Sequence, residues 1–127
     1  MKRTTTEAIR NVLWRVYPDL RHIWLVDRTY DLPPLDLVEK LVTESKIFTL
    51  DLDDCDDYSL QSHAFVRLRN PHWAYGEVIG YLDVGIGEVV HAMNLTITAQ
   101  GVRFYDAKEH KFYKPKEIDF KPFFVRM

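Results

Sequence analysis

The chain has 127 residues, of which 46% are hydrophobic and 28% are charged, a composition typical of a globular domain with an ordinary core. Its formal net charge of −2 and isoelectric point near 6.2 argue against a nucleic-acid-binding surface or a polybasic membrane anchor. No apolar run approaches the roughly 20 residues of a membrane span, and no apolar signal core follows the first basic residues. One cysteine cannot form an internal disulfide, so we expect a cytoplasmic protein with a single domain over residues 1–127.

The first part of the chain predicts two helices with an extended segment between them. Residues 4–17, TTTEAIRNVLWRVY, have capping-box spacing at Thr4 and Glu7 and a broad apolar face, and they stop before a proline. Residues 22–30, HIWLVDRTY, are rich in β-forming side chains and predict a strand. After two prolines, residues 35–46, LDLVEKLVTESK, predict a second helix.

The second part predicts one more helix and then only strands. Residues 47–52 read as an extended approach to a helix that starts at Asp54 and closes at Asn70. Four segments with strand character follow, at residues 74–85, 88–99, 102–113 and 121–127. Helices first and strands afterwards predict an α+β fold, with N-terminal helices packed on a C-terminal antiparallel sheet. We expect the three tryptophans, Trp14, Trp24 and Trp73, to be core residues.

The only cysteine, Cys55, lies among acids at the start of the predicted third helix. Aspartates stand at positions 51, 53, 54, 56 and 57. A helix N-terminus lowers the pKa of a thiol, and the thiolate is the reactive species. The free N–H groups of the first turn can also bind an oxyanion. The structural alternative is a capped helix start with solvated charges and a small buried cysteine.

His91 and Asp106 are candidates for the base and the residue that orients it. Strand alternation puts His91 on one face with Met93. If Ile97 lies opposite Val102, Asp106 comes opposite Met93 and diagonal to His91, about 7–8 Å away between Cα atoms. His91 also fits the role of a core histidine with a satisfied side chain.

The hairpin register decides whether that pair forms. A tighter turn at Gln100–Gly101 would move Asp106 toward Leu95 and separate it from His91. Asn94 points to the opposite face of the strand, so we do not expect it to orient the imidazole.

These residues carry a resemblance to a known family. The DCDD motif at a helix start, HAMN on a strand 36 residues after the cysteine and an acid 15 residues later resemble the papain-like/transglutaminase-like cysteine peptidase superfamily. Within it, the chain looks most like small bacterial and phage members and the calcium-dependent protease half of a mushroom agglutinin. The resemblance spans roughly residues 50–110 and implies a papain-like minimal core over the single domain.

The resemblance implies a cysteine-dependent hydrolase, a peptidase or amidase that acts on a peptide or amide substrate through a thioester. Cys55 would be the nucleophile, His91 the general base and acid, and Asp106 the residue holding the imidazole. No glutamine precedes Gln61 to complete an oxyanion hole, so Trp24 or Tyr30 would have to substitute. The alternatives are an acyl transferase or an inactive binding or structural module of the same fold, derived from a phage.

The acids also suggest a cation. Negative charges around a thiol oppose its ionisation, and a bound cation would reverse that effect. Carboxylate oxygens suit calcium better than zinc. The calcium-dependent relative makes Asp56 and Asp57 the candidate ligands. We expect neither nucleic acid nor membrane as a partner, and the sequence leaves the oligomeric state open.

Overall fold

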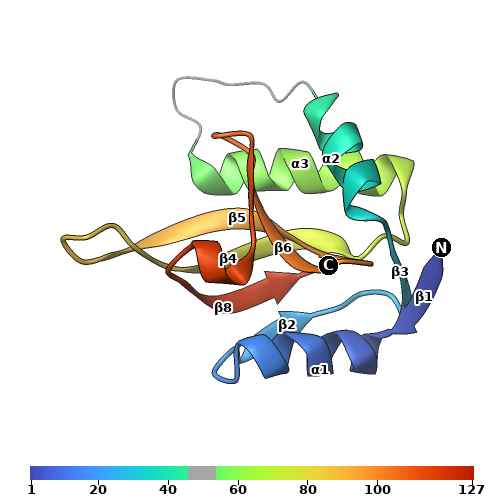
Figure 1. The fold of residues 1–127 in the computed structure, drawn as a ribbon, viewed down its shortest axis with the longest axis horizontal. Helices are drawn as coiled ribbons and strands as arrows, with labels where there is room; N and C mark the ends of the chain where they lie inside the picture. The colour runs from blue at the N-terminus through green and yellow to red at the C-terminus, as the bar shows by residue number, and fades with distance from the viewer. Residues whose placement is uncertain (46–53) are drawn as a thin grey trace.

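The computed structural model describes residues 1–45 and 54–127. The extended segment expected at 47–52, together with Asp51 and Asp53, lies outside the described residues. The described chain is built on a twisted sheet with helices on both faces (Figure 1). The helices are α1 (Thr6–Val16), α2 (Leu35–Thr43) and α3 (Cys55–Arg69), with a 3-10 turn η1 (Pro115–Glu117).

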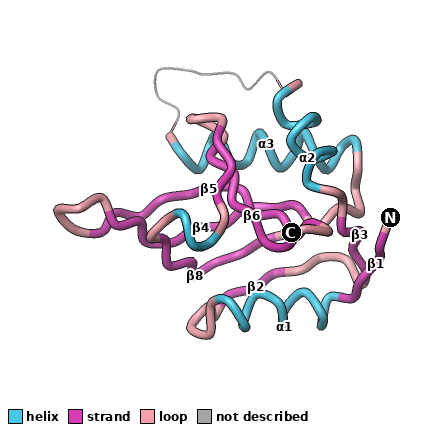
Figure 2. Tube along the Cα trace, in the orientation of Figure 1, coloured by secondary structure: helices cyan, strands magenta, loops and turns pink. Residues whose placement is uncertain are grey.

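Six strands form the main sheet in the order β2-β8-β4-β5-β6-β7. Their bounds are β2 (His22–Trp24), β4 (Tyr75–Asp83), β5 (Glu88–Thr98), β6 (Gly101–Asp106), β7 (Lys111–Tyr113) and β8 (Phe120–Arg126). Two short strands, β1 (Lys2–Thr5) and β3 (Thr29–Leu32), pair with each other in a separate antiparallel ribbon. The β4–β5 hairpin extends beyond the other strands (Figure 2).

The α+β class is confirmed, but the sheet is mixed rather than antiparallel. β2 runs parallel to β8, with Ile23 opposite Val125. The strand expected at 22–30 is also two strands in two different sheets. Between them the chain crosses over, and hydrogen bonds replace the ladder: Val26 N–H donates to the carbonyl of Met127, and Thr6 N–H to that of Arg28.

The helices begin close to their predicted positions. The N-cap of α1 is Thr5 rather than Thr4, and its hydroxyl accepts a 3.1 Å hydrogen bond from the backbone N–H of Ala8. For α2 the N-cap is Pro34, which has no polar side chain. A distant residue supplies the cap, since Gln100 Oε1 accepts a 2.8 Å hydrogen bond from the backbone N–H of Leu35.

The two faces of the sheet carry different cores. The face toward α1 is apolar and packs Ile9 and Leu13 against sheet residues that include Val78, Met93 and Phe104. The face toward α2 and α3 mixes apolar, aromatic and polar side chains, including Val38, Val66, Tyr75, Tyr105 and Asn94. No helix of the described residues combines the length and apolar character needed to cross a membrane.

Of the three tryptophans expected in the core, only one is buried. Trp73 is 9% exposed, whereas Trp14 is 43% and Trp24 is 61% exposed. Trp14 donates its indole N–H to the carbonyl of Leu20, and Trp24 packs its ring against Phe124 at 5.8 Å between centroids. Both side chains therefore stay partly exposed within the described part of the chain, which sequence periodicity does not reveal.

An ion network centred on the buried carboxylate of Glu77 joins α3 to the sheet. Glu77 of β4 receives hydrogen bonds from Arg126 of β8 at 2.6 Å and 3.0 Å and from His63 of α3 at 2.9 Å. Burial raises the pKa of Glu77, but the hydrogen bonds from His63 and Arg126 outweigh it, so the pKa lies below its usual value. The carboxylate therefore stays charged and holds three elements together.

Candidate active site around Cys55

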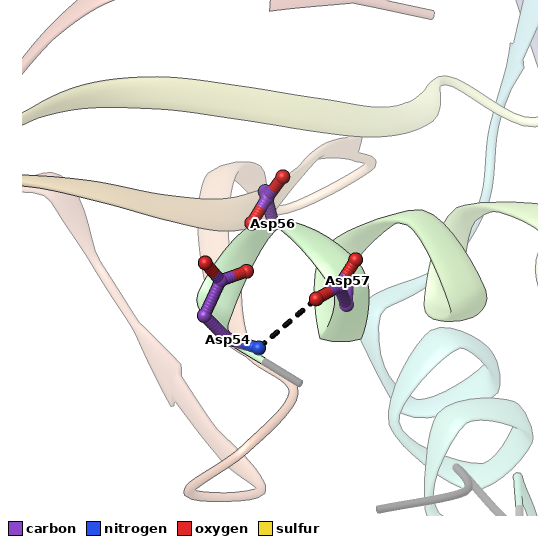
Figure 3. A group of neighbouring side chains, drawn as sticks. All are labelled: Asp54, Asp56 and Asp57. Carbon is purple, nitrogen blue, oxygen red and sulfur yellow. Dashed lines mark hydrogen bonds between the residues drawn. The ribbon is translucent and has the colours of Figure 1, made fainter. Parts of the chain in front are cut away.

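Cys55 is the first residue of α3, and acids cap this helix. Asp54 is the N-cap, and its backbone N–H donates to Asp57 Oδ2 at 3.0 Å (Figure 3). The backbone N–H of Tyr58 donates to the carbonyl of Asp54 at 3.2 Å. These acids therefore have a structural role at the positive end of the helix dipole, as the capping alternative expects.

The thiol of Cys55 lies against β5. Its Sγ accepts a 3.3 Å hydrogen bond from the backbone N–H of Ala92, the residue after His91. Cys55 is half-buried rather than enclosed. No hydrogen bond joins the side chains of Cys55 and His91 in the part of the chain that the structure describes.

His91 and Asp106 meet across the sheet. His91 Nε2 and Asp106 Oδ2 are 3.1 Å apart, and both side chains are largely buried, at 20% and 13% exposure. The β5–β6 register places Ile97 opposite Val102, with Ala99–Gln100 as the turn. This is the register for which the diagonal contact was expected, and the tighter turn at Gln100–Gly101 does not form.

Asp106 is held at both carboxylate oxygens. Oδ1 accepts hydrogen bonds of 3.0 Å from the backbone N–H groups of Lys108 and Glu109, while Oδ2 faces His91. Burial raises the pKa of Asp106, but the hydrogen bonds from His91, Glu109 and Lys108 outweigh it and hold the pKa below its usual value. The carboxylate of Asp106 accepts a hydrogen bond from the Nε2–H group of His91, and Nδ1 is then the nitrogen with the free lone pair.

Sequence reasoning missed the backbone groups that complete this arrangement. The N–H groups of Lys108 and Glu109 form an Asx-type turn after Asp106, and the DAKE segment carries the composition of such a turn. The N–H of Ala92 gives no sequence signal, because any residue there would supply it.

Two further side chains that the sequence analysis considered for the site, Asn94 and Tyr30, have partners elsewhere in the fold. Asn94 donates to the carbonyls of Ser59 at 2.8 Å and Gly76 at 2.9 Å, so it fixes α3 on the sheet and does not orient His91. Tyr30 is buried, and its hydroxyl donates to the carbonyl of Met127 at 3.1 Å. It therefore serves the core and the chain end.

Three carboxylates gather at the start of α3 (Figure 3). Asp54, Asp56 and Asp57 each offer an oxygen, and these oxygens lie within 4.8 Å of one another. Asp56 and Asp57 were the expected pair, and Asp54 joins them because the N-cap residue turns back over the first turn. Hard oxygen donors at this spacing suit a calcium ion in type, although three carboxylates supply only part of its usual six to eight ligands.

The fold is similar to that of solved lectin structures. The chain resembles the Polyporus squamosus lectin PSL1a in its complex with E64, with a TM-score of 0.72 and 18% sequence identity, over 98% of this chain and 50% of that chain. It also resembles the Polyporus squamosus lectin bound to the human-type influenza-binding epitope Neu5Acα2-6Galβ1-4GlcNAc. The TM-score is again 0.72 and the sequence identity 16%, over 98% of this chain and 49% of that chain. This chain thus spans about half the length of each lectin chain. At these identities the likeness is one of fold. No protein-family model and no curated protein matches the sequence.

These findings correct the relationship inferred from the DCDD and HAMN motifs. The two solved structures described above are of a lectin, so the assignment to the papain-like/transglutaminase-like cysteine peptidase superfamily is wrong. The expected cysteine protease function, with a peptide or amide as substrate, is wrong on the same finding, because the lectin of the second structure is bound to a glycan epitope. The acyl-transferase alternative loses its basis with it, whereas the alternative of a binding module is matched in part, because the lectin of the second structure is bound to a glycan.

We predict that Asp106→Asn lowers the free energy of unfolding by about 1–2 kcal/mol at pH 7, because the amide loses the charge-assisted hydrogen bonds. The folded-state pKa of Asp106 lies below its usual value of 3.8, so its stabilisation is complete above that value and is lost as the pH falls through the folded pKa. Urea unfolding at pH 7, 5, 4 and 3 would measure a difference from wild type that shrinks with acid. The exposed Asp19→Asn serves as control, and a loss that is independent of pH would contradict the charge argument.

Proposed function

We propose that Cys55, His91 and Asp106 form a reactive-thiol site in which Cys55 is the nucleophile. The observation that carries the proposal is the 3.1 Å contact between His91 of β5 and Asp106 of β6. The residue after His91 on β5, Ala92, donates its backbone N–H to Cys55 Sγ. A nucleophilic thiol needs a base nearby, and the base needs a third group that orients it. The three residues supply these roles from α3, β5 and β6.

Two groups with positive partial charge lie at the thiol of Cys55. The positive end of the α3 dipole and the N–H of Ala92 both stabilise negative charge on Cys55 Sγ. Asp106 holds the Nε2 proton of His91, so Nδ1 is the atom that takes the thiol proton. With iodoacetamide as the reagent, the thiolate forms an S–C bond, and iodide leaves with the electron pair of the broken C–I bond.

The sequence also predicted a papain-like minimal core, and this proposal uses only the arrangement of side chains that such a core would have. It is a thiol at a helix N-terminus beside a strand that carries a histidine, with an acid on the next strand. No kinship is needed for it, since the same catalytic arrangements recur on unrelated folds.

We predict that Cys55 reacts with iodoacetamide at pH 7 about tenfold faster or more than it does in His91→Ala, because the imidazole acts as general base for the thiol proton. Stopped-time labelling followed by intact-mass spectrometry would give both rates. E64, the compound in the first lectin complex, is tested in the same way for an adduct at Cys55.

Two controls separate a local effect from a general one. His22→Ala removes an exposed histidine of β2 and should leave the labelling rate unchanged. Cys55→Ala should abolish the mass increase. Equal, slow labelling of wild type and His91→Ala, with circular dichroism showing both folded, would refute the reactive-thiol proposal.

A calcium ion at Asp54, Asp56 and Asp57 is part of the same proposal. Bound there, it would supply positive charge that offsets the acids beside Cys55. We predict a rise in Tm of about 4 °C when Ca²⁺ exceeds its dissociation constant about tenfold, and a smaller rise with Mg²⁺. Asp56→Asn should remove the Ca²⁺ effect, while Asp36→Asn, an acid in the first turn of α2, should preserve it. Equal shifts with both ions would count against a calcium site.

Glycan binding is the second candidate function. Exposed aromatic side chains favour it: Trp24 of β2 packs on Phe124, and Tyr81 of β4, 45% exposed, packs on Phe123 at 5.1 Å between ring centroids. Flat rings with open faces offer an apolar platform on which a sugar ring can stack. The glycan epitope in the second lectin structure indicates which sugar to test first.

We predict that Neu5Acα2-6Galβ1-4GlcNAc shifts the indole N–H resonance of Trp24 in a ¹H–¹⁵N titration, because stacking changes the ring environment. Trp24→Ala should abolish saturable binding, and Trp14→Ala, which removes an exposed tryptophan elsewhere, should not. Galβ1-4GlcNAc tests whether the sialic acid contributes. No saturable shift at millimolar sugar would exclude this candidate.

A further inference from the structure

A pocket away from Cys55 lies between α1, the start of β6 and the segment that enters η1. Its volume is about 520 Å³, within the range of small-molecule sites. Apolar side chains from all three segments line it: Val12, Val16, Val102 and Pro115. It shares no lining residue with the Cys55 site.

Four cations line this pocket, and none of its lining residues in the described part of the chain is an acid. Arg15 comes from α1, Arg103 from β6, and Lys114 and Lys116 from either side of Pro115. None of the four takes part in an ion pair within residues 1–45 and 54–127. The chain as a whole has a net charge of −2, so this local excess of positive charge runs against the overall balance.

Two acids lie in a smaller neighbouring pocket of about 170 Å³, which shares Arg103 and Lys114. They are Glu39 and Glu117. Glu117 is engaged in the 3-10 turn, where its Oε1 accepts a 2.7 Å hydrogen bond from the backbone N–H of Lys114. Neither acid lines the larger pocket, so its cations face a space without a carboxylate.

Local structure accounts for only part of this charge. Arg15 lies in the last turn of α1, where a cation offsets the negative end of the helix dipole. Arg103 donates from Nη1 to the carbonyl of Val102 at 2.9 Å, which keeps its guanidinium at the pocket. Lys114 and Lys116 have no comparable partner for their side chains among the described residues, although solvated lysines are common on any surface.

We propose that this pocket binds a small organic anion with an apolar body, through a carboxylate or phosphate head group. The head group lies among Arg103, Lys114 and Lys116, since guanidinium and ammonium groups bind such oxyanions directly. The apolar body packs on Val12, Val16 and Val102. This binding site is independent of the thiol chemistry proposed above.

The test compares ligands that share one apolar body. Octanoate and octyl phosphate are titrated into the ¹⁵N-labelled full chain, with octylammonium and octan-1-ol as cationic and neutral counterparts. We expect both anions to shift the backbone amides of Val12, Val16 and Val102 saturably, and to lose affinity as NaCl is raised. The better of the two anions identifies the head group. Octylammonium should give no saturable shift.

Matched variants test the cations. Arg103→Gln with Lys116→Gln should weaken anion binding about tenfold, as expected for the loss of two partly exposed ion pairs. Lys2→Gln with Arg28→Gln removes the same charge from β1 and from the residue before β3, and it should leave the affinity unchanged.

Three results would overturn the proposal. They are equal binding of octan-1-ol and octanoate, equal weakening by both double variants, and the absence of saturable shifts at these amides. The salt dependence and the comparison of ligands use the wild-type chain, so the proposal stays falsifiable even if a variant fails to fold.

Discussion

The buried carboxylate of Glu77 is the constraint on which the rest of the structure depends. It is 7% exposed and is paired with Arg126 of the last strand and His63 of α3. Loss of either partner would leave the buried carboxylate with less compensation, although the cost is reduced on the side of Arg126, whose side chain is 44% exposed to solvent. α3 can therefore not shift along the sheet without breaking this network. Cys55 lies eight residues before His63, about 12 Å along the helix, so Glu77 also fixes where the thiol meets β5.

The polar character of the interface between α3 and the sheet gives a second constraint. Ser62 and Tyr75 share a 2.5 Å hydrogen bond inside it, and Asn94 reaches the carbonyl of Ser59. Burial raises the pKa of Tyr75, which keeps its hydroxyl neutral and able to bond to Ser62. Such bonds are satisfied in one relative position only, whereas the apolar face toward α1 tolerates small displacements. The face that carries the candidate site is thus the more rigidly specified one.

Local patterns were enough to predict most helices and strands, because periodicity and caps act within a few residues. The parallel pairing of β2 with β8 was missed, since it joins Ile23 to Val125 across the whole chain and leaves no local signal. The sequence allowed two registers of the β5–β6 hairpin, and only one of them brings His91 and Asp106 together. The register depends on the turn that contains Gln100, and the side chain of Gln100 accepts a hydrogen bond from the first residue of α2.

The family assignment failed for a different physical reason. The motif residues have structural uses that any fold can require: Asp54 and Asp57 cap α3, and Asn94 bonds to two carbonyl groups. Short motifs built from capping acids and buried amides are therefore weak evidence for membership of one family. Their order along the chain shows which residues come together, and says less about what the assembled protein recognises.

The turn at Ala99–Gln100 has a consequence for how this chain can change over evolution. Ala99 N–H donates to the carbonyl of Pro33 and Gln100 caps α2, so both turn residues are tied to a neighbouring helix. An insertion or deletion of one residue here would slide β6 against β5 and move Asp106 to the other side of the sheet, while both strands could still pair. The contact between His91 and Asp106 thus depends on the length of a turn that contains neither residue. Homologues whose turn differs by one residue would lose the contact even if they kept both side chains.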